Sequence, residues 1–367
     1  MGSHRSGTGS RGVARWLIAL VVAIVVVAVV AVAMVWLSGR SEQEGRDAAA
    51  TCVRGDLPVH VAAAPALVES LRRVADTFNS SGTVSADYCA KIEVSGVDSP
   101  VALGALTGTW DTKLGAAPSL WIPESTVWTA RLAAAKPAEV SGQPTSIASS
   151  PVVLAVRASA REDFADVRWL DLPGKQQSLR IALPTGADSD GTFLAAQSVA
   201  AAVGRTGGAA LSDDAAKSPV VTGSLQRWAS AAPRSTSAVA TLESLTTPGD
   251  GALAVPVTEQ QLYAFGRGRG GAAPIGVHPG GPTASATYPA AVLDRGDTSD
   301  AQERAAADFV AFLTEDDNAA PLAEAGFRVP GRPTPAGTPS VDFGTVEPSA
   351  PASNAAVTTL ADAIKGR

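Results

Sequence analysis

The feature that most constrains this chain is an uncharged apolar run of 21 residues from Trp16 to Trp36. As a helix this run reaches about 31 Å, which is enough to cross the hydrocarbon core of a bilayer. A tryptophan stands at each end, where indole rings favour the membrane interface. Arg5, Arg11 and Arg15 precede the run, so the positive-inside rule predicts a cytoplasmic N-terminus.

We therefore expect a cytoplasmic segment at 1–15, a single-pass plasma-membrane anchor at 16–37, a polar tether at 38–55 and an extracytoplasmic main domain. A cleaved signal peptide is the alternative, although the apolar region of such peptides is usually about 7 to 15 residues long. A lipoprotein modified at Cys52 is rejected, because a charged stretch separates Cys52 from the apolar run.

Composition favours a binding protein over an enzyme. The chain has 29 basic and 35 acidic residues, so it lacks the basic excess of a nucleic-acid binder. With 3 histidines and 2 cysteines, it is poorly supplied for a metal site or for Cys/His catalysis. We therefore predict no enzyme activity, no cofactor, no metal site and no nucleic-acid partner.

Cys52 and Cys89 both fall on the predicted outer side of the membrane, where an oxidising environment favours a disulfide. Closing that loop would stabilise the fold by about 4 kcal/mol in the chain-entropy model. Two unpaired thiols are the alternative.

Short apolar runs alternate with helical patterns from residue 56 onward, which predicts an α/β fold. The clearest strands are 57–64, 119–122, 150–156, 179–183, 251–257 and 288–293. Helices are expected at 66–78, 101–106, 125–135, 192–203, 225–232, 238–245, 259–265, 301–313 and 319–325. Residues 336–367 are Pro-rich over most of their length and are expected to form a tail, with a short helical stretch at 355–365.

Several segments, taken in order, resemble the type II periplasmic solute-binding proteins. They are APALVESLRRVADTF, SLWIPESTVW, IASSPVVLAV, LRIALPTGADSDGTFLAAQSVAA, LAVPVTEQQLYAF and RAAADFVAFLTEDDNAAPLAEAGFRVP. The resemblance covers about residues 56–335. It looks closest to membrane-anchored actinobacterial members that often carry a von Willebrand A domain downstream, whose Asp-x-Ser-x-Ser motif this chain lacks.

The resemblance implies two α/β lobes joined by two crossover strands, 150–156 and 288–293. Lobe one would comprise residues 56–149 and 294–335, and lobe two residues 150–293. A small ligand of unknown identity would bind in the cleft between them, and the lobes would close around it.

The family geometry also places strand-to-helix turns around the cleft. The ligand-binding residues expected there are Ala64, Pro65, Glu124, Ser125, Ser149, Ser150, Thr185, Asp188, Ser189, Thr192 and Glu259. Exposed N–H groups at helix starts favour anions or carbonyl oxygens. Helix capping is the competing interpretation for each hydroxyl and carboxylate.

Carboxylates in these turns, with no lysine or arginine nearby in sequence, argue against an oxyanion such as phosphate or molybdate. Trp110, Trp121, Trp128 and Trp228 are expected in the core more than on a ligand. Two functions remain: a receptor that captures a solute, with a transporter as partner, or an envelope scaffold that uses the same fold to bind another envelope protein.

Overall fold

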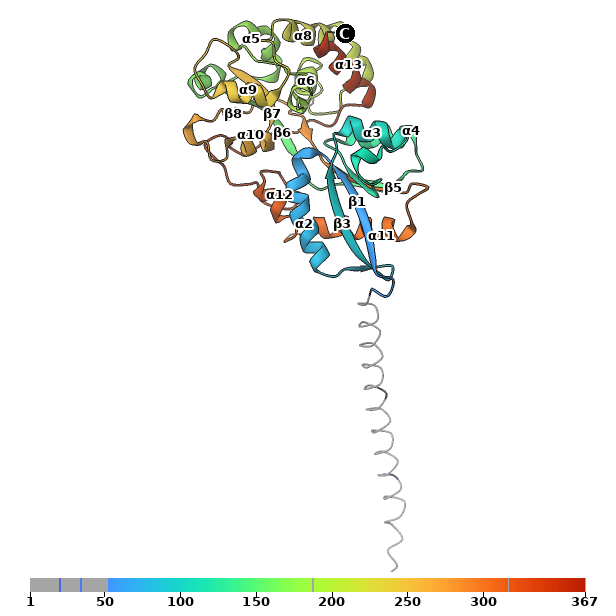
Figure 1. The fold of residues 1–367 in the computed structure, drawn as a ribbon. Coiled ribbons are helices and arrows are strands. Elements are labelled where there is room, and N and C mark those ends of the chain that lie inside the picture. Colours follow the sequence, from blue (N-terminus) through green and yellow to red (C-terminus); the bar gives the residue numbers. More distant parts are fainter. Residues whose placement is uncertain (1–19, 21–33, 35–51, 187, 316, 367) are drawn as a thin grey trace, which may run out of the picture.

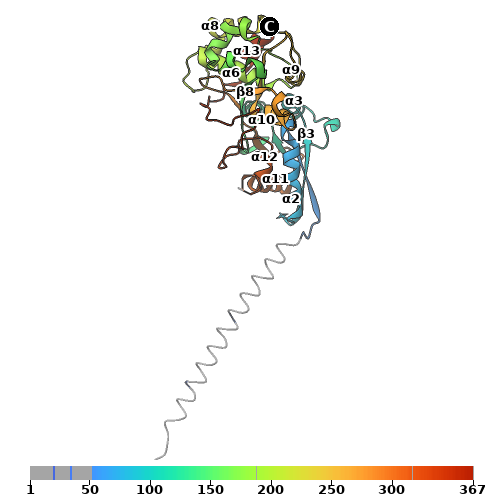
Figure 2. The same cartoon turned by 90° about the vertical axis from the view of Figure 1, so that its left-hand side faces the viewer.

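The computed structural model describes residues 52–186, 188–315 and 317–366, together with Leu20 and Met34. In this part of the chain no helix is both long and apolar enough to cross a bilayer. The predicted anchor lies outside the described residues, apart from Leu20 and Met34. The main domain consists of two stacked lobes (Figure 1), and the quarter turn of Figure 2 again places α8 and α13 at one end and α2 and α11 at the other.

Lobe one is built on a six-stranded mixed sheet in the order β2-β3-β1-β4-β10-β5. The strands are β1 (Asp56–Ala63), β2 (Val84–Ser85), β3 (Tyr88–Gly96), β4 (Leu120–Ile122), β5 (Val140–Ser146) and β10 (Pro289–Leu293). β1 runs parallel to β3 and β4, as the strand–helix alternation predicts, while β10 runs antiparallel to β4. The strand that returns from lobe two thus completes the sheet of lobe one.

Helices with buried apolar residues cover this sheet. They are α2 (Val68–Ser80), α3 (Ser99–Thr107), α4 (Thr126–Ala135), α11 (Asp300–Thr314) and α12 (Ala320–Glu324), with short 3-10 turns at Pro65–Leu67 and Thr112–Leu114. Of these helices, α12 packs on α2. In α2, Leu71, Val74 and Phe78 recur at helical spacing and are buried. The Phe78 ring meets that of Phe309 edge to face, with centroids 5.3 Å apart.

Lobe two is built around β6 (Ser150–Val156), all of whose residues are buried. β7 (Ala254–Thr258), β8 (Ile275–Val277) and β9 (Ser285–Ala286) pair with it, all antiparallel. The helices are α5 (Leu172–Leu179), α6 (Asp190–Val203), α7 (Asp213–Lys217), α8 (Pro219–Ser230), α9 (Ala238–Leu245) and α10 (Glu259–Gly266), with 3-10 segments at Ala158–Phe164, Trp169–Asp171 and Gly270–Ala272. The strand expected at 179–183 is reduced to a single bridge between Ile181 and Ala254.

Each of the two predicted crossover strands begins just after the point where the chain has passed from one lobe to the other. β6 belongs to the sheet of lobe two and β10 to the sheet of lobe one. Where the chain passes between lobes, the two crossings bond to each other: Ser146 Oγ donates to the Thr287 carbonyl at 2.6 Å, and the Ile147 N–H to the Tyr288 carbonyl at 3.2 Å. The hinge is therefore a bonded pair of segments.

The Pro-rich segment after residue 335, expected to be a tail, instead packs against lobe two. The Gly276 N–H donates to the Ser340 carbonyl, and Thr283 pairs with the backbone around Pro348. The chain then ends its described course in α13 (Asn354–Lys365), which packs against α6, α7 and α8. This segment carries the chain from lobe one into lobe two once more.

The predicted disulfide between Cys52 and Cys89 is confirmed. It joins the segment before β1 to β3, the neighbouring strand, and Cys89 is paired in register with Asp56. The bridge therefore secures the end of lobe one where the described chain begins.

Candidate ligand-binding site

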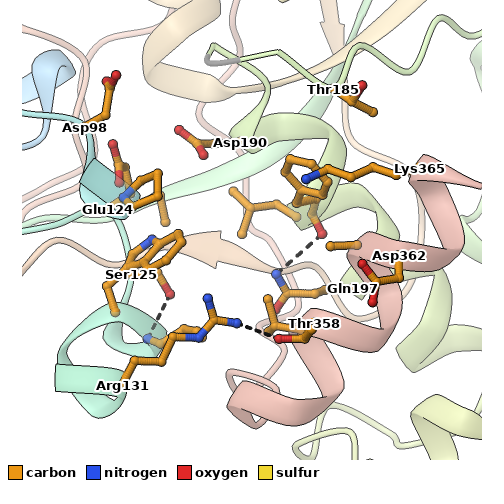
Figure 3. Close-up of a pocket in the computed structure, with 18 of the residues that line it drawn as sticks. Asp98, Glu124, Ser125, Arg131, Thr185, Asp190, Gln197, Thr358, Asp362 and Lys365 are labelled. Atoms are coloured by element: carbon orange, nitrogen blue, oxygen red, sulfur yellow. Dashed lines mark hydrogen bonds between the residues drawn. The ribbon is translucent and has the colours of Figure 1, made fainter. Parts of the chain in front are cut away.

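A cavity of about 390 Å³ lies between the lobes (Figure 3). Lobe one contributes residues at the starts of α3 and α4, and lobe two contributes α6, the loop before it and α13. The lining residues are Asp98, Pro100, Glu124, Ser125, Val127, Trp128, Arg131, Thr185, Gly186, Asp190, Phe193, Leu194, Gln197, Ala286, Val357, Thr358, Ala361, Asp362 and Lys365.

Three helices begin at this cavity. Asp98 and Ser125 are the N-cap residues of α3 and α4, and the Ser125 hydroxyl accepts a hydrogen bond from the Val127 N–H at 3.2 Å. α6 begins at Asp190. The starts of α4 and α6 fall in turns that the sequence places around the cleft, whereas the start of α3 does not.

Four carboxylates line the cavity: Asp98 and Glu124 from lobe one, and Asp190 and Asp362 from lobe two (Figure 3). Glu124 is held in place by Ser99, whose hydroxyl donates to its carboxylate while accepting from the Glu124 N–H. Burial raises the pKa of Glu124 despite that hydrogen bond. The hydrogen bonds with Ser99 thus make the start of α3 determine how the Glu124 side chain is oriented.

Asp190 is the most perturbed group of the cavity. The Asp190 residue is exposed to solvent in the cleft, yet protein from both lobes crowds around its carboxylate, and no described group donates a hydrogen bond to it. This desolvation, together with the charges of Glu124 and Asp98, raises the pKa of Asp190 to about 8. A cationic group in the cavity would relieve the part of this shift that comes from the charges of Glu124 and Asp98.

The opposite side of the cavity carries cations on aromatic rings. The Arg131 guanidinium lies 4.9 Å from the centre of the Trp128 ring, and Lys365 Nζ lies 5.2 Å from the centre of the Phe193 ring. Partial burial lowers the pKa of Arg131. The cavity is thus acidic at the starts of α3, α4 and α6, whereas the side toward α13 combines Arg131 and Lys365 with Asp362. Among the described residues, no group of three or more His, Cys, Asp and Glu side chains is arranged to hold a metal ion.

Of the residues that the sequence places in the cleft, Glu124, Ser125 and Thr185 line the cavity. Ala64 is buried, and its N–H donates to the Ile122 carbonyl, while Pro65 is exposed at the start of a 3-10 turn. Neither residue belongs to the cavity lining.

Four further predicted residues serve the hinge or cap helices. Asp188 accepts from Ser237 Oγ and the Val239 N–H and so holds the start of α9. Burial opposes its ionisation, but these hydrogen bonds bring the pKa of Asp188 below its usual value. Ser150 Oγ accepts from the Gln260 N–H, Ser149 pairs with Arg328 through backbone, and Glu259 forms ion pairs at the hinge.

Ser189 and Thr192 are buried beside the start of α6 but do not line the cavity. Their hydroxyl oxygens have no hydrogen-bond partner among the described residues. Capping and hinge contacts thus account for four of the eight predicted positions outside the cavity.

The expected core role holds for Trp121 and Trp228, which are fully buried, whereas Trp128 lines the cavity. Sequence reasoning missed Asp98, Arg131 and the whole contribution of α13. Asp190 was visible as a carboxylate in the right turn. Arg131 lies in the second turn of α4, beyond the strand-to-helix turn that the sequence predicts. Nothing in the local sequence indicates that α13 would line the cleft.

The sequence matches the model of the bacterial extracellular solute-binding protein family over residues 59–328. The chain is 33% identical over 348 residues to the uncharacterized protein Rv1836c of Mycobacterium tuberculosis H37Rv, covering 89% of this chain and 50% of that protein. A second Mycobacterium tuberculosis protein, from strain CDC 1551, matches equally. The chain therefore spans about half the length of these curated relatives.

Solved structures with the same fold include type II solute-binding proteins. Trichodesmium IdiA (FutA), in complex with iron and citrate, superposes with a TM-score of 0.60 at 12% identity, covering 84% of this chain and 98% of that one. Iron-bound HitA from Pseudomonas aeruginosa gives 0.58 at 18% identity, covering 84% and 97%. The sulfate-binding protein SubI from Mycobacterium tuberculosis H37Rv gives 0.51 at 18%, covering 76% and 88%. With its two lobes and interlobe cavity, this chain belongs to the bacterial extracellular solute-binding proteins and has their type II fold.

Proposed function

We propose that this protein is a membrane-anchored extracytoplasmic receptor that captures a small solute between its lobes. The observation that carries the proposal is the interlobe cavity, to which both lobes contribute charged side chains. A ligand bound there would contact both lobes at once, which is what allows a solute to stabilise a closed form.

The charges of the cavity favour an organic solute that carries a cationic group. Asp98 and Glu124 would repel an oxyanion, whereas a protonated amine would compensate their charge and that of ionised Asp190. Trp128 offers an aromatic face beside them, and Arg131 with Lys365 would accept an anionic group at the other side. The iron, citrate and sulfate named for the structural relatives belong to those proteins.

The apolar run from Trp16 to Trp36 supports a single-pass anchor in the plasma membrane, with the bilobal domain outside. In this arrangement the receptor stays near the membrane, where a transporter or another envelope protein would be its partner. An envelope scaffold is the second candidate, and one observation favours it: α13 of lobe two contacts α4 of lobe one and so links the lobes without a ligand.

The test starts with native mass spectrometry of the full-length protein in detergent, purified from its own envelope. A small mass released on denaturation supports the receptor. Isothermal titration then compares putrescine, arginine and glycine betaine with sulfate, phosphate and ferric citrate. We expect binding within the first group.

The matched variants are Asp190→Asn and Asp308→Asn, the second being an exposed carboxylate on α11. We expect Asp190→Asn to weaken binding at least tenfold and Asp308→Asn to leave it unchanged. If only sulfate, phosphate or ferric citrate binds, the protein is still a receptor, but the proposal of a cationic organic ligand is overturned. An empty protein that binds none of these probes would favour the scaffold.

A further inference from the structure

Helix α13 is anchored on lobe two by an apolar face. Ala356, Leu360, Ala363 and Ile364 recur at helical spacing and are buried. The face packs against α6, α7 and α8, and Ser353 caps the first turn by accepting from the Ala356 N–H. The position of α13 is therefore set by lobe two.

The other face of α13 lines the cavity and meets lobe one there. Arg131, on α4, donates from Nη2 to Thr358 Oγ1 at 2.8 Å and, more weakly, to the Asn354 carbonyl at 3.4 Å (Figure 3). The Thr358 hydroxyl gives its own proton to the Asn354 carbonyl at 3.0 Å. Its lone pairs are therefore free to accept from the guanidinium, which carries donors only.

The guanidinium is also held from its other side. It lies over the Trp128 ring of the same helix, which restricts its orientation and favours one approach to Thr358. Because Arg131 is part of lobe one and Thr358 of lobe two, this hydrogen bond spans the cleft.

We infer that α13 is a latch: by binding Arg131 of the opposite lobe it holds the cleft partly closed before any solute arrives. Opening the cleft requires the guanidinium to leave Thr358, and a solute with an anionic group would compete with α13 for the same donors. The latch thus adds to the proposed function a control on how readily the cleft opens.

The test measures the lobe-to-lobe distance directly and without a solute, so it is independent of whether the cleft binds one. Spin labels are placed on the full-length protein at Asp76→Cys on α2 and Val220→Cys on α8, both exposed and on different lobes. Pulsed electron–electron double resonance then gives the distribution of distances between the two spin labels. Thr358→Val removes the acceptor with little change of shape, and Thr358→Ser retains it as the matched control.

We expect the population with a wider cleft to rise roughly tenfold in Thr358→Val, the effect of losing one hydrogen bond to a charged group. Arg131→Met should reproduce that change, and Thr358→Ser should match the parent. Circular dichroism confirms that each variant is folded. Distance distributions that are the same in all four proteins would overturn the latch, as would an equal shift in Thr358→Ser and Thr358→Val.

Discussion

Glu259 and Arg328, which are 69 residues apart in the chain, form a two-pronged ion pair beside the hinge, with Nε–Oε2 at 2.6 Å and Nη2–Oε1 at 2.7 Å. Glu259 is fully buried, and His278 Nε2 lies 2.7 Å from its Oε1. Burial opposes the charge of Glu259, but hydrogen bonds from Arg328 and His278 hold its pKa below the usual value. The Arg328 backbone also pairs with Ser149 at the first crossing. Arg328 therefore joins its own segment after α12 to the first crossing and to the start of α10.

We predict that Arg328→Met destabilises the protein by about 3 to 5 kcal/mol, because it leaves a buried carboxylate without its main partner. Arg73→Met is the control: it removes an arginine from an exposed pair with Glu324 and should cost about 0 to 1 kcal/mol. Urea unfolding at pH 7 gives both values. Since the pKa of Glu259 is lowered by folding, the contribution of the pair is present above about pH 4.5 and is lost as the pH falls below it. Equal losses in the two variants would contradict the prediction.

The disulfide offers a second prediction. Cys52 and Cys89 are 37 residues apart in sequence, and closing a loop of this length stabilises a fold by about 4 kcal/mol in the chain-entropy model. The double variant Cys52→Ser/Cys89→Ser should therefore unfold at a lower urea concentration. Reduction of the parent should give the same midpoint as the variant. If reductant leaves the urea midpoint of the parent protein unchanged, the prediction that the disulfide stabilises the fold is refuted.

The raised pKa of Asp190 makes amine binding depend on pH. Below its pKa of about 8 the carboxyl must release a proton before it can pair with a cation. The affinity for putrescine should therefore rise between pH 6 and pH 8, by at most about tenfold per pH unit, and level off above. Titrations in buffers of different ionisation enthalpy at pH 7 should show proton release.

Asp190→Asn serves as the control, because its weaker affinity should vary little with pH in this range.

The stability of the free protein should depend on pH in the opposite direction to the affinity. Folding raises the pKa of Asp190, so the stability that this group contributes is present below its ordinary pKa near 4 and is lost as the pH rises through about 8. At pH 9 the free Asp190→Asn protein should thus be more stable than the parent. A parent whose affinity for putrescine is flat from pH 6 to pH 8 would disprove the pKa assignment.

Gly191 fixes how closely α6 approaches β7. A Cβ at this position would lie 2.4 Å from the Pro256 carbonyl oxygen and 2.5 Å from Val257 Cα, both backbone atoms that cannot move aside easily. Gly191→Ala should destabilise the fold by about 1 to 3 kcal/mol and displace the neighbouring Asp190. Gly174→Ala in α5, where a Cβ meets nothing within 4 Å, should be neutral or slightly stabilising. Thermal unfolding of the two variants provides the comparison, and equal melting temperatures would argue against close packing at α6.

Local patterns predict the main elements well where one physical signal dominates. The continuous apolar run from Ser150 to Val156 gives a strand with those bounds, and Ala238–Leu245 is likewise a helix, capped by Ser237. Where signals conflict the prediction is wrong. The apolar run at 179–183 suggests a strand, but Leu179 ends α5, and only Ile181 pairs, through a single bridge to Ala254.

The cavity was predicted in part, because turns at the ends of strands can be found from the strands themselves. Glu124, Ser125 and Thr185 illustrate this. The side of the cavity formed by α13 depends on a contact between Arg131 and Thr358, which are 227 residues apart. Neither residue carries a local signal for the other. The proline content of the preceding segment is typical of linkers, yet this segment bonds to lobe two through its backbone.

The path of the chain also determines the order in which the lobes can be finished during synthesis. Val341 and Phe343 pack into a cluster with Val153 and Leu262, and the Phe343 ring lies 5.7 Å from that of Tyr263. Lobe one likewise needs β10 and α11 from the last third of the chain. Both hydrophobic cores therefore stay incomplete until these segments have been synthesised. A nascent chain that still lacks them cannot finish either lobe, which suits a protein whose family is exported.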